Sequence, residues 1–159
     1  FRRVLFRSVS TAGWVPGIDE LMDFDVPVRL ALSLHAADDR TRDQLMPINK
    51  RWPIANVLSA CRRYADRTGR RVFIEYLMLE GINDSVADAK RLATILRDGR
   101  FHVNLIEYNA TGGPYEGSSQ ERRRRFAEEL ESAGLYPSLR RSRGADIAAA
   151  CGQLANSTT

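Results

Sequence analysis

The chain has 159 residues, of which 43% are hydrophobic and 28% charged, with a formal net charge of +4. This length suits one domain or part of a larger one, and no apolar run approaches the roughly 20 residues that span a membrane. Its two cysteines lie 90 positions apart, without CxxC or Cys/His metal-ligand spacing, so a disulfide framework is excluded and a reducing cytoplasm is the expected compartment. We expect the protein to be soluble and monomeric.

The opening residues, FRRVLFRS, have no helical or alternating pattern that continues into the next segment of the chain. The first of them is phenylalanine rather than methionine. We interpret residues 1–8 as a non-native leader and residues 9–159 as the C-terminal part of one domain. Arg2, Arg3 and Arg7 supply three positive charges, so the overall charge gives little support for a nucleic-acid partner.

Strands and helices alternate in the first half of the remaining chain. Residues 9–13 (VSTAG) indicate the end of a strand, and residues 28–35 (VRLALSLH) a strand that is apolar nearly throughout, as in parallel sheets covered on both faces. Short helices are expected at 16–22 and 38–45. Pro53 begins an amphipathic helix whose apolar stripe holds Ile54, Val57, Leu58, Cys61 and Tyr64, which places Cys61 in the core.

The second half continues this alternation, with a Gly/Pro/Ser loop at 110–119 and a helix stop at Gly134. Strands are expected at 71–79, 102–109 and 136–141, and helices at 85–96 and 120–133. Asp84 or Ser85 caps the first of these helices, whose stripe includes Val86, Ala89, Leu92, Ala93 and Leu96. The order predicts an α/β fold with a parallel sheet, amounting to half of a β/α barrel.

Four polar residues lie at or after the ends of predicted strands: Ser10, Ser33, His35 and Asn109. Active residues of β/α barrels cluster where strands end. Neutral hydrogen-bonding groups suit ribose hydroxyls, an amino-acid head group or an adenine edge. Each residue alone is also compatible with a turn or cap role.

His35 is in addition a candidate general base. No carboxylate stands at motif distance, however, because Asp38 and Asp39 are expected to cap the next helix. The sequence therefore predicts no catalytic triad around His35.

Cys151 lies between small residues in RGADIAAACGQLA (143–155), a segment predicted to be helical until Gly152. Small neighbours leave the sulfur approachable, so a reactive thiol and a buried structural one both stay open. The run Arg122–Arg125 is expected to be mostly solvated helix surface. Arg140, Arg141 and Arg143, with the loop 112–115, could contact an RNA backbone and stack on a base.

Six motifs carry a resemblance to a known family. They are VSTAG (9–13), LALSLHA (30–36), MPINK (46–50), IEYLMLEGIND (74–84), VNLIEYNATGGPY (103–115) and RGADIAAACGQLA (143–155). In this order and spacing, from about Val9 to Ala155, the chain resembles the C-terminal half of the RlmN/Cfr family of radical S-adenosylmethionine (SAM) methyltransferases. The resemblance implies a partial radical SAM, TIM-like barrel, C-terminal half only.

By the same resemblance, the expected reaction is methylation of an adenine in large-subunit ribosomal RNA and, for the RlmN type, in tRNA. We favour the RlmN type, which acts at adenine C2, over the Cfr type, which acts at C8. A noncatalytic RNA-binding half-barrel is the alternative from a different class.

The resemblance also implies site residues. Cys151 corresponds to the methyl-carrying cysteine, and the residues corresponding to SAM contacts are Ser10, Ser33, Leu34, His35 and Asn109. The family's second reactive cysteine, its Gly-Glu contact to the methionine moiety and its CxxxCxxC loop for a 4Fe-4S cluster belong to the half that this chain lacks. The chain has no metal ligands of its own by this comparison, and Glu107 stands where the family usually shows proline. The isolated chain is therefore expected to be inactive, and the full-length enzyme to need an electron donor.

Overall fold

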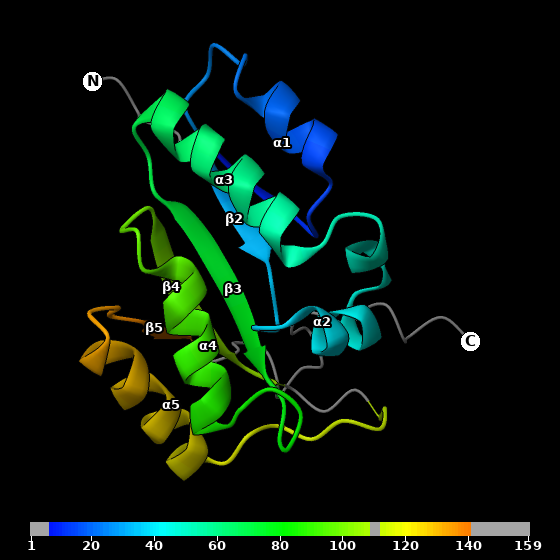
Figure 1. Ribbon diagram of the computed structural model, residues 1–159, viewed down its shortest axis with the longest axis vertical. Helices are drawn as coiled ribbons and strands as arrows, with labels where there is room; N and C mark the ends of the chain where they lie inside the picture. The colour runs from blue at the N-terminus through cyan, green and yellow to red at the C-terminus, as the bar shows by residue number, and fades with distance from the viewer. Residues whose placement is uncertain (1–6, 109–111, 141–159) are drawn as a thin grey trace.

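The computed structural model describes residues 7–108 and 112–140. Strands and helices alternate along them (Figure 1). The elements are β1 (Arg7–Thr11), α1 (Val15–Leu21), β2 (Val28–Ser33), α2 (Asp39–Leu45), the 3₁₀ helix η1 (Pro47–Lys50), α3 (Ile54–Thr68), β3 (Val72–Met78), α4 (Val86–Leu96), β4 (Phe101–Glu107), α5 (Gln120–Ser132) and β5 (Ser138–Arg140). No helix in this part of the chain is long and apolar enough to cross a membrane.

The strands form one parallel sheet in the order β1-β2-β3-β4-β5. Neighbours in the sheet are therefore neighbours in sequence, and each crossover returns beside the strand that it left. Figure 1 shows α1, α3, α4 and α5 on one side of the sheet. This arrangement is part of a β/α barrel wall, and it confirms the predicted α/β fold.

The strands β2 and β3 alternate between buried and more accessible residues. In β2, Val28, Leu30 and Leu32 are buried, whereas Arg29 is exposed and Ser33 half-buried. The prediction of a strand covered on both faces is therefore wrong for β2. Its reason is topological: consecutive strand order puts the crossover helices of the described chain on one face, whereas a doubly wound sheet has them on two.

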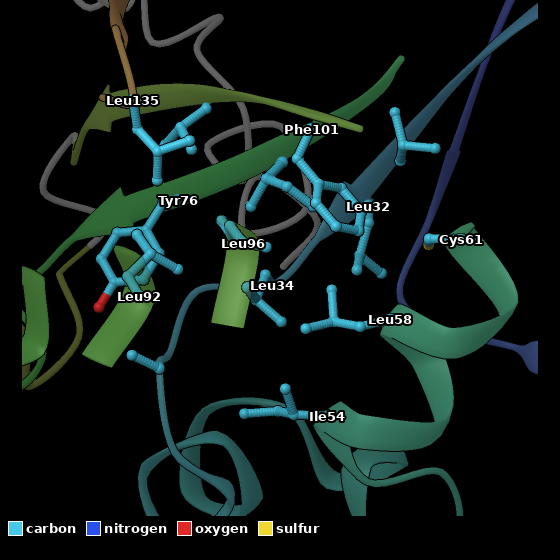
Figure 2. Close-up of a cluster of buried hydrophobic side chains, with 14 of the residues drawn as sticks. Leu32, Leu34, Ile54, Leu58, Cys61, Tyr76, Leu92, Leu96, Phe101 and Leu135 are labelled. Atoms are coloured by element: carbon cyan, nitrogen blue, oxygen red, sulfur yellow. The ribbon is translucent and has the colours of Figure 1, made fainter. Parts of the chain in front are cut away.

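The hydrophobic core fills the space between the sheet and its helices (Figure 2). The predicted stripe of α3 is confirmed, because its five residues are at most 6% exposed. Cys61 lies there beside Leu58 and is fully buried. In α4, Ala89, Leu92, Ala93 and Leu96 are buried, but Val86 is 42% exposed. Val86 is the first residue of α4 and sits at the edge of the stripe, so that part of the prediction is wrong.

Helix caps join the elements at the carboxyl end of the sheet. Asp38 caps α2 as predicted, by accepting a hydrogen bond from the Thr41 N–H at 2.9 Å. Asp39 instead serves α3, since its carboxylate accepts from the Ile54 N–H at 2.8 Å. Pro53 at the start of α3 has no side chain that could do so. Asp39 therefore fixes the approach of α3 to α2.

Candidate functional site

Ser10 and Ser33 lie on the sheet face opposite the helices. Ser10 is exposed and is paired with Ala31, and Ser33 follows Ala31 by two residues. Because successive residues of a strand point to opposite faces, Ser10 and Ser33 share one face. The structure thus brings two of the predicted polar residues together on adjacent strands.

Leu34 is placed differently. Its side chain is fully buried in the core (Figure 2). Its backbone N–H donates to the carbonyl of Glu75 at 3.0 Å, which continues the pairing of β2 with β3. The side chain of Leu34 is therefore not available to a ligand, and the predicted contact of this residue stays a prediction.

His35 turns the chain away from the sheet. Its φ is +59°, the left-handed region that bulky residues rarely adopt. The ring Nδ1 accepts a hydrogen bond from the backbone N–H of Leu77 at 3.1 Å. The ring thereby replaces a strand carbonyl at the end of β2. Because Nδ1 accepts, the proton of the neutral imidazole is on Nε2.

The charge state of His35 depends on its surroundings. Burial, and secondly the positive charge of Arg42, lower the pKa of His35 from 6.5 to about 4. The imidazole is therefore neutral near neutral pH, with Nδ1 already engaged. This arrangement offers an Nε2–H hydrogen-bond donor, and it does not support the general-base interpretation.

Asn83, in the turn after β3, holds the chain around His35. Its amide Nδ2 donates to the carbonyls of His35 and Leu77, both at 2.7 Å. Its Oδ1 accepts from the Leu79 N–H at 2.8 Å. Asn83 is 1% exposed, so its polar atoms make these internal hydrogen bonds and do not face solvent. A buried asparagine therefore supports the strained backbone of His35.

Arg42 of α2 also holds strand ends together and is fully buried. Its Nη2 donates to the carbonyls of Ala12 at 2.7 Å and Ser33 at 3.1 Å. Its Nε donates to the carbonyl of Leu34 at 3.0 Å, and its Nη1 to Oδ1 of Asn49 at 2.9 Å. Arg42 therefore ties the ends of β1 and β2 to η1. Burial lowers the pKa of Arg42 from its usual value, and nearby carboxylates oppose that shift.

Polar side chains continue across the same face of the sheet. Glu75 is paired with Ser33 on one side and Asn104 on the other. The Asn104 Nδ2 donates to Oε1 of Glu75 at 2.8 Å, and a guanidinium nitrogen of Arg140 lies 3.6 Å from that oxygen. The polar row thus runs from Ser33 to β5. Sequence reasoning missed Glu75 and Asn104, although both alternate with apolar residues in predicted strands.

The arginine run of α5 has a divided role. Arg124 and Arg125 are 56% and 65% exposed and pair with Glu121, and Arg122 is 46% exposed, so the prediction of a mostly solvated run is confirmed. Arg122 instead reaches the buried carboxylate of Asp84 at 2.8 Å. Arg123 pairs with Glu107 at 2.8 Å and is 22% exposed. Those two arginines fasten α5 to the loop after β3 and to the end of β4.

The two cysteines and Asn109 differ in what the structure says of them. Burial raises the pKa of the Cys61 thiol to about 12, which makes it an inert core residue as predicted. Cys151, Asn109, Arg141 and Arg143 lie outside the described residues, so their predicted roles stay predictions. No group of three or more His, Cys, Asp or Glu residues within 7–108 and 112–140 could hold a metal ion.

The known proteins that this chain resembles are longer than the chain. No family model matches. "Probable dual-specificity RNA methyltransferase RlmN" of Heliobacterium modesticaldum is 50% identical over 148 residues, which are 92% of the chain and 38% of that protein. The crystal structure of a radical SAM methyltransferase from Sphaerobacter thermophilus matches with a TM-score of 0.90 and 49% identity, covering 92% of the chain and 43% of that protein. These matches confirm the resemblance to RlmN proteins.

A more distant structure supports the fold alone. A domain of pyruvate-formate lyase-activating enzyme from Bacteroides vulgatus matches with a TM-score of 0.68 at 21% identity, over 85% of the chain and 81% of that domain. The chain spans about two fifths of the length of the RlmN relative and of the Sphaerobacter protein. It corresponds to a portion of such proteins.

Proposed function

We propose that the chain is part of a dual-specificity RNA methyltransferase of the RlmN type, which methylates C2 of an adenine in large-subunit ribosomal RNA and in tRNA. The observation that carries this proposal is the 50% identity to an RlmN protein over 92% of the chain. The complete enzyme would act as a cytoplasmic monomer with an external electron donor.

The carboxyl ends of β1 and β2 would bind the cosubstrate. Ser10 and Ser33 share the accessible sheet face, and neutral His35 presents an Nε2–H donor. Hydroxyls and a neutral imidazole suit the ribose hydroxyls and adenine edge of SAM, because these ligand groups carry no formal charge. We include Asn109 in this site on the resemblance of its motif.

Cys151 would carry the methyl group. When bound, SAM supplies a methyl group on a sulfonium. The Cys151 thiolate would attack that methyl carbon, so that a new S–C bond forms while the sulfonium C–S bond breaks and S-adenosylhomocysteine leaves. A carrier is needed because adenine C2 is electron-poor and bears a hydrogen, and so cannot displace the methyl group itself.

The 4Fe-4S cluster of such enzymes does not fit this chain. Clusters of this kind need several cysteine thiolates. The chain has two cysteines, and the thiol of one, Cys61, is buried with a raised pKa. We therefore assign the cluster to the remainder of the complete enzyme and no ligand of it to these 159 residues.

Cysteine variants of the complete enzyme test this function. We expect Cys151→Ala to abolish methylation of ribosomal RNA, measured as 2-methyladenosine by nucleoside mass spectrometry. Cys61→Ala is the matched control and should keep activity within a few-fold, since it removes only a small buried group.

Three other results of these experiments would change the proposed function. Turnover by Cys151→Ala would remove Cys151 from the mechanism. If the wild type formed 8-methyladenosine and no 2-methyladenosine, the enzyme would be of the Cfr type. A wild-type protein that binds RNA without methylating it would favour the noncatalytic half-barrel.

A further inference from the structure

Arg42 is a buried cation whose hydrogen bonds go to neutral acceptors. It is the largest fully buried side chain of the described residues. Its oxygen partners are three main-chain carbonyls and the amide oxygen of Asn49, and its Nη2 also lies 4.0 Å from the Met46 sulfur. Asp39 and Asp43, the nearby carboxylates, accept from the other side of that amide, at 3.0 and 2.7 Å. Asn49 thus stands between the guanidinium and its counter-charges.

Such an arrangement is a costly way to stabilise a fold. Removing a charge from water carries a penalty that apolar packing avoids. A guanidinium, however, has five N–H donors in a rigid plane, which can hold several oxygens in fixed relative positions. Here the oxygens belong to Ala12, Ser33 and Leu34, which are the ends of two adjacent strands.

The held peptides are those that lead to the proposed cosubstrate contacts. Ala12 follows Ser10 by two residues, and Ser33 and Leu34 directly precede His35. We propose that Arg42 is a positioning residue, which sets the separation of Ser10 from Ser33 and the direction of His35 so that they fit the adenosine part of SAM. This inference rests on the proposed function.

The neutral state of His35 agrees with this role. The Arg42 charge is one cause of the lowered pKa of His35, after burial. With His35 neutral, its Nδ1 can accept from the Leu77 N–H while Nε2 remains a donor. Arg42 therefore acts on the orientation of the ring through the backbone and on its protonation through its charge.

Arg42→Lys is the sharpest test, because it keeps the charge and removes the planar fork. A lysine ammonium cannot hold the four acceptors that the guanidinium holds. Arg62→Lys is the matched control. Arg62 also donates to a carbonyl, that of Ile95 at 2.8 Å, and pairs with Asp98, but it joins α3 to the end of α4 rather than to the strand ends that Arg42 holds.

The measurement is binding of S-adenosylhomocysteine to the complete enzyme by titration calorimetry, together with the KM for SAM and with kcat. We expect Arg42→Lys to weaken binding and raise KM by roughly tenfold or more, with a smaller change in kcat. Arg62→Lys should bind within about twofold of the wild type, even if both variants lose similar thermal stability.

The results separate this inference from the function on which it rests. If the wild type does not bind S-adenosylhomocysteine, the proposed function fails and the inference fails with it. If the wild type binds and a folded Arg42→Lys binds equally well, the positioning role is wrong and the function stands. Should Arg42→Lys not fold, Asn49→Ala decides, because it removes one acceptor of Arg42 and should weaken binding in the same direction.

Discussion

His35 combines a strained backbone with two hydrogen bonds that only its position allows. A left-handed φ of +59° costs a non-glycine residue of the order of 1 kcal/mol. Glycine would avoid that cost but would leave the Leu77 N–H without the ring nitrogen. The imidazole thus continues the sheet beyond the end of β2, and Asn83 binds the His35 carbonyl.

Protonation of His35 should destabilise the chain. The pKa is about 4 in the folded protein and 6.5 when unfolded, so between these values the unfolded chain binds more protons. Stability is therefore full above pH 6.5 and declines as the pH falls toward 4, by up to about 3 kcal/mol. Urea unfolding at several pH values would measure this decline.

His35→Asn provides the comparison for that measurement. Asparagine tolerates the left-handed backbone, and its Oδ1 can accept a hydrogen bond without titrating. The unfolding free energy of the variant should lack the decline that His35 causes between about pH 6.5 and 4. The contribution of the carboxylates should be the same in both proteins. An unchanged difference in unfolding free energy between the two proteins across this range would contradict the assignment.

Sequence alone predicted Ser10, Ser33 and His35 as candidate site residues because each stands at or after the end of a predicted strand. It could not locate the side chains that support them. Arg42 binds a carbonyl 30 residues away, and Asn83 binds one 48 residues away. In sequence, Arg42 looks like any surface arginine of a short polar helix, and only the folded chain shows that strand ends surround it.

At the scale of elements, periodicity sufficed for their order. The order of the strands and α-helices of the described residues agrees with the predicted order, because α3 and α4 carry apolar stripes and β2, β3 and β4 are short apolar runs. β1 begins at Arg7, within the segment interpreted as a leader. β5 is shorter than expected, at three residues. The expectation that β2 is covered on both faces gave too little weight to Arg29, which shares the accessible face with Ala31 and Ser33, because those two residues are small and look compatible with burial.

The loops at the carboxyl end of the sheet depend on Asp84. Its carboxylate accepts from the Gly81 N–H at 3.0 Å, the Ser118 hydroxyl at 2.8 Å and Arg122 at 2.8 Å. The side chain is 1% exposed, whereas that of Arg122 is 46% exposed. One carboxylate thus joins the loop after β3 to the loop before α5.

Asp84→Ala should therefore be strongly destabilising. It leaves a buried hydroxyl and a partly buried N–H without their acceptor, at an expected cost of about 2–4 kcal/mol in unfolding free energy. Glu121→Ala is the control, since that carboxylate is 52% exposed and also pairs with arginines of α5, and it should cost much less than Asp84→Ala. Equal costs in urea unfolding would show that the buried network does not hold the loops.

At the scale of the whole molecule, the described sheet has two open edges. β1 is largely exposed, and Trp14 and Phe24 near it are 51% and 65% exposed. On the other edge, β5 is exposed throughout. Apolar surface beside an unpaired strand is what a portion of a barrel presents where the rest of the wall would join it. The match to 43% of the Sphaerobacter protein agrees with this interpretation.

The proposed assignment of the cluster to the remainder of the complete enzyme predicts how the 159-residue chain behaves with iron and sulfide. A 4Fe-4S cluster needs several accessible thiolates, whereas this chain has Cys151 and a Cys61 whose pKa is raised to about 12 by burial. Anaerobic reconstitution should therefore give no stoichiometric iron-sulfur absorbance with the chain, while the complete enzyme treated in parallel should take up a cluster. A chain that bound iron and sulfide at full occupancy would have ligands within these residues, and the proposed division of the catalytic parts would be wrong.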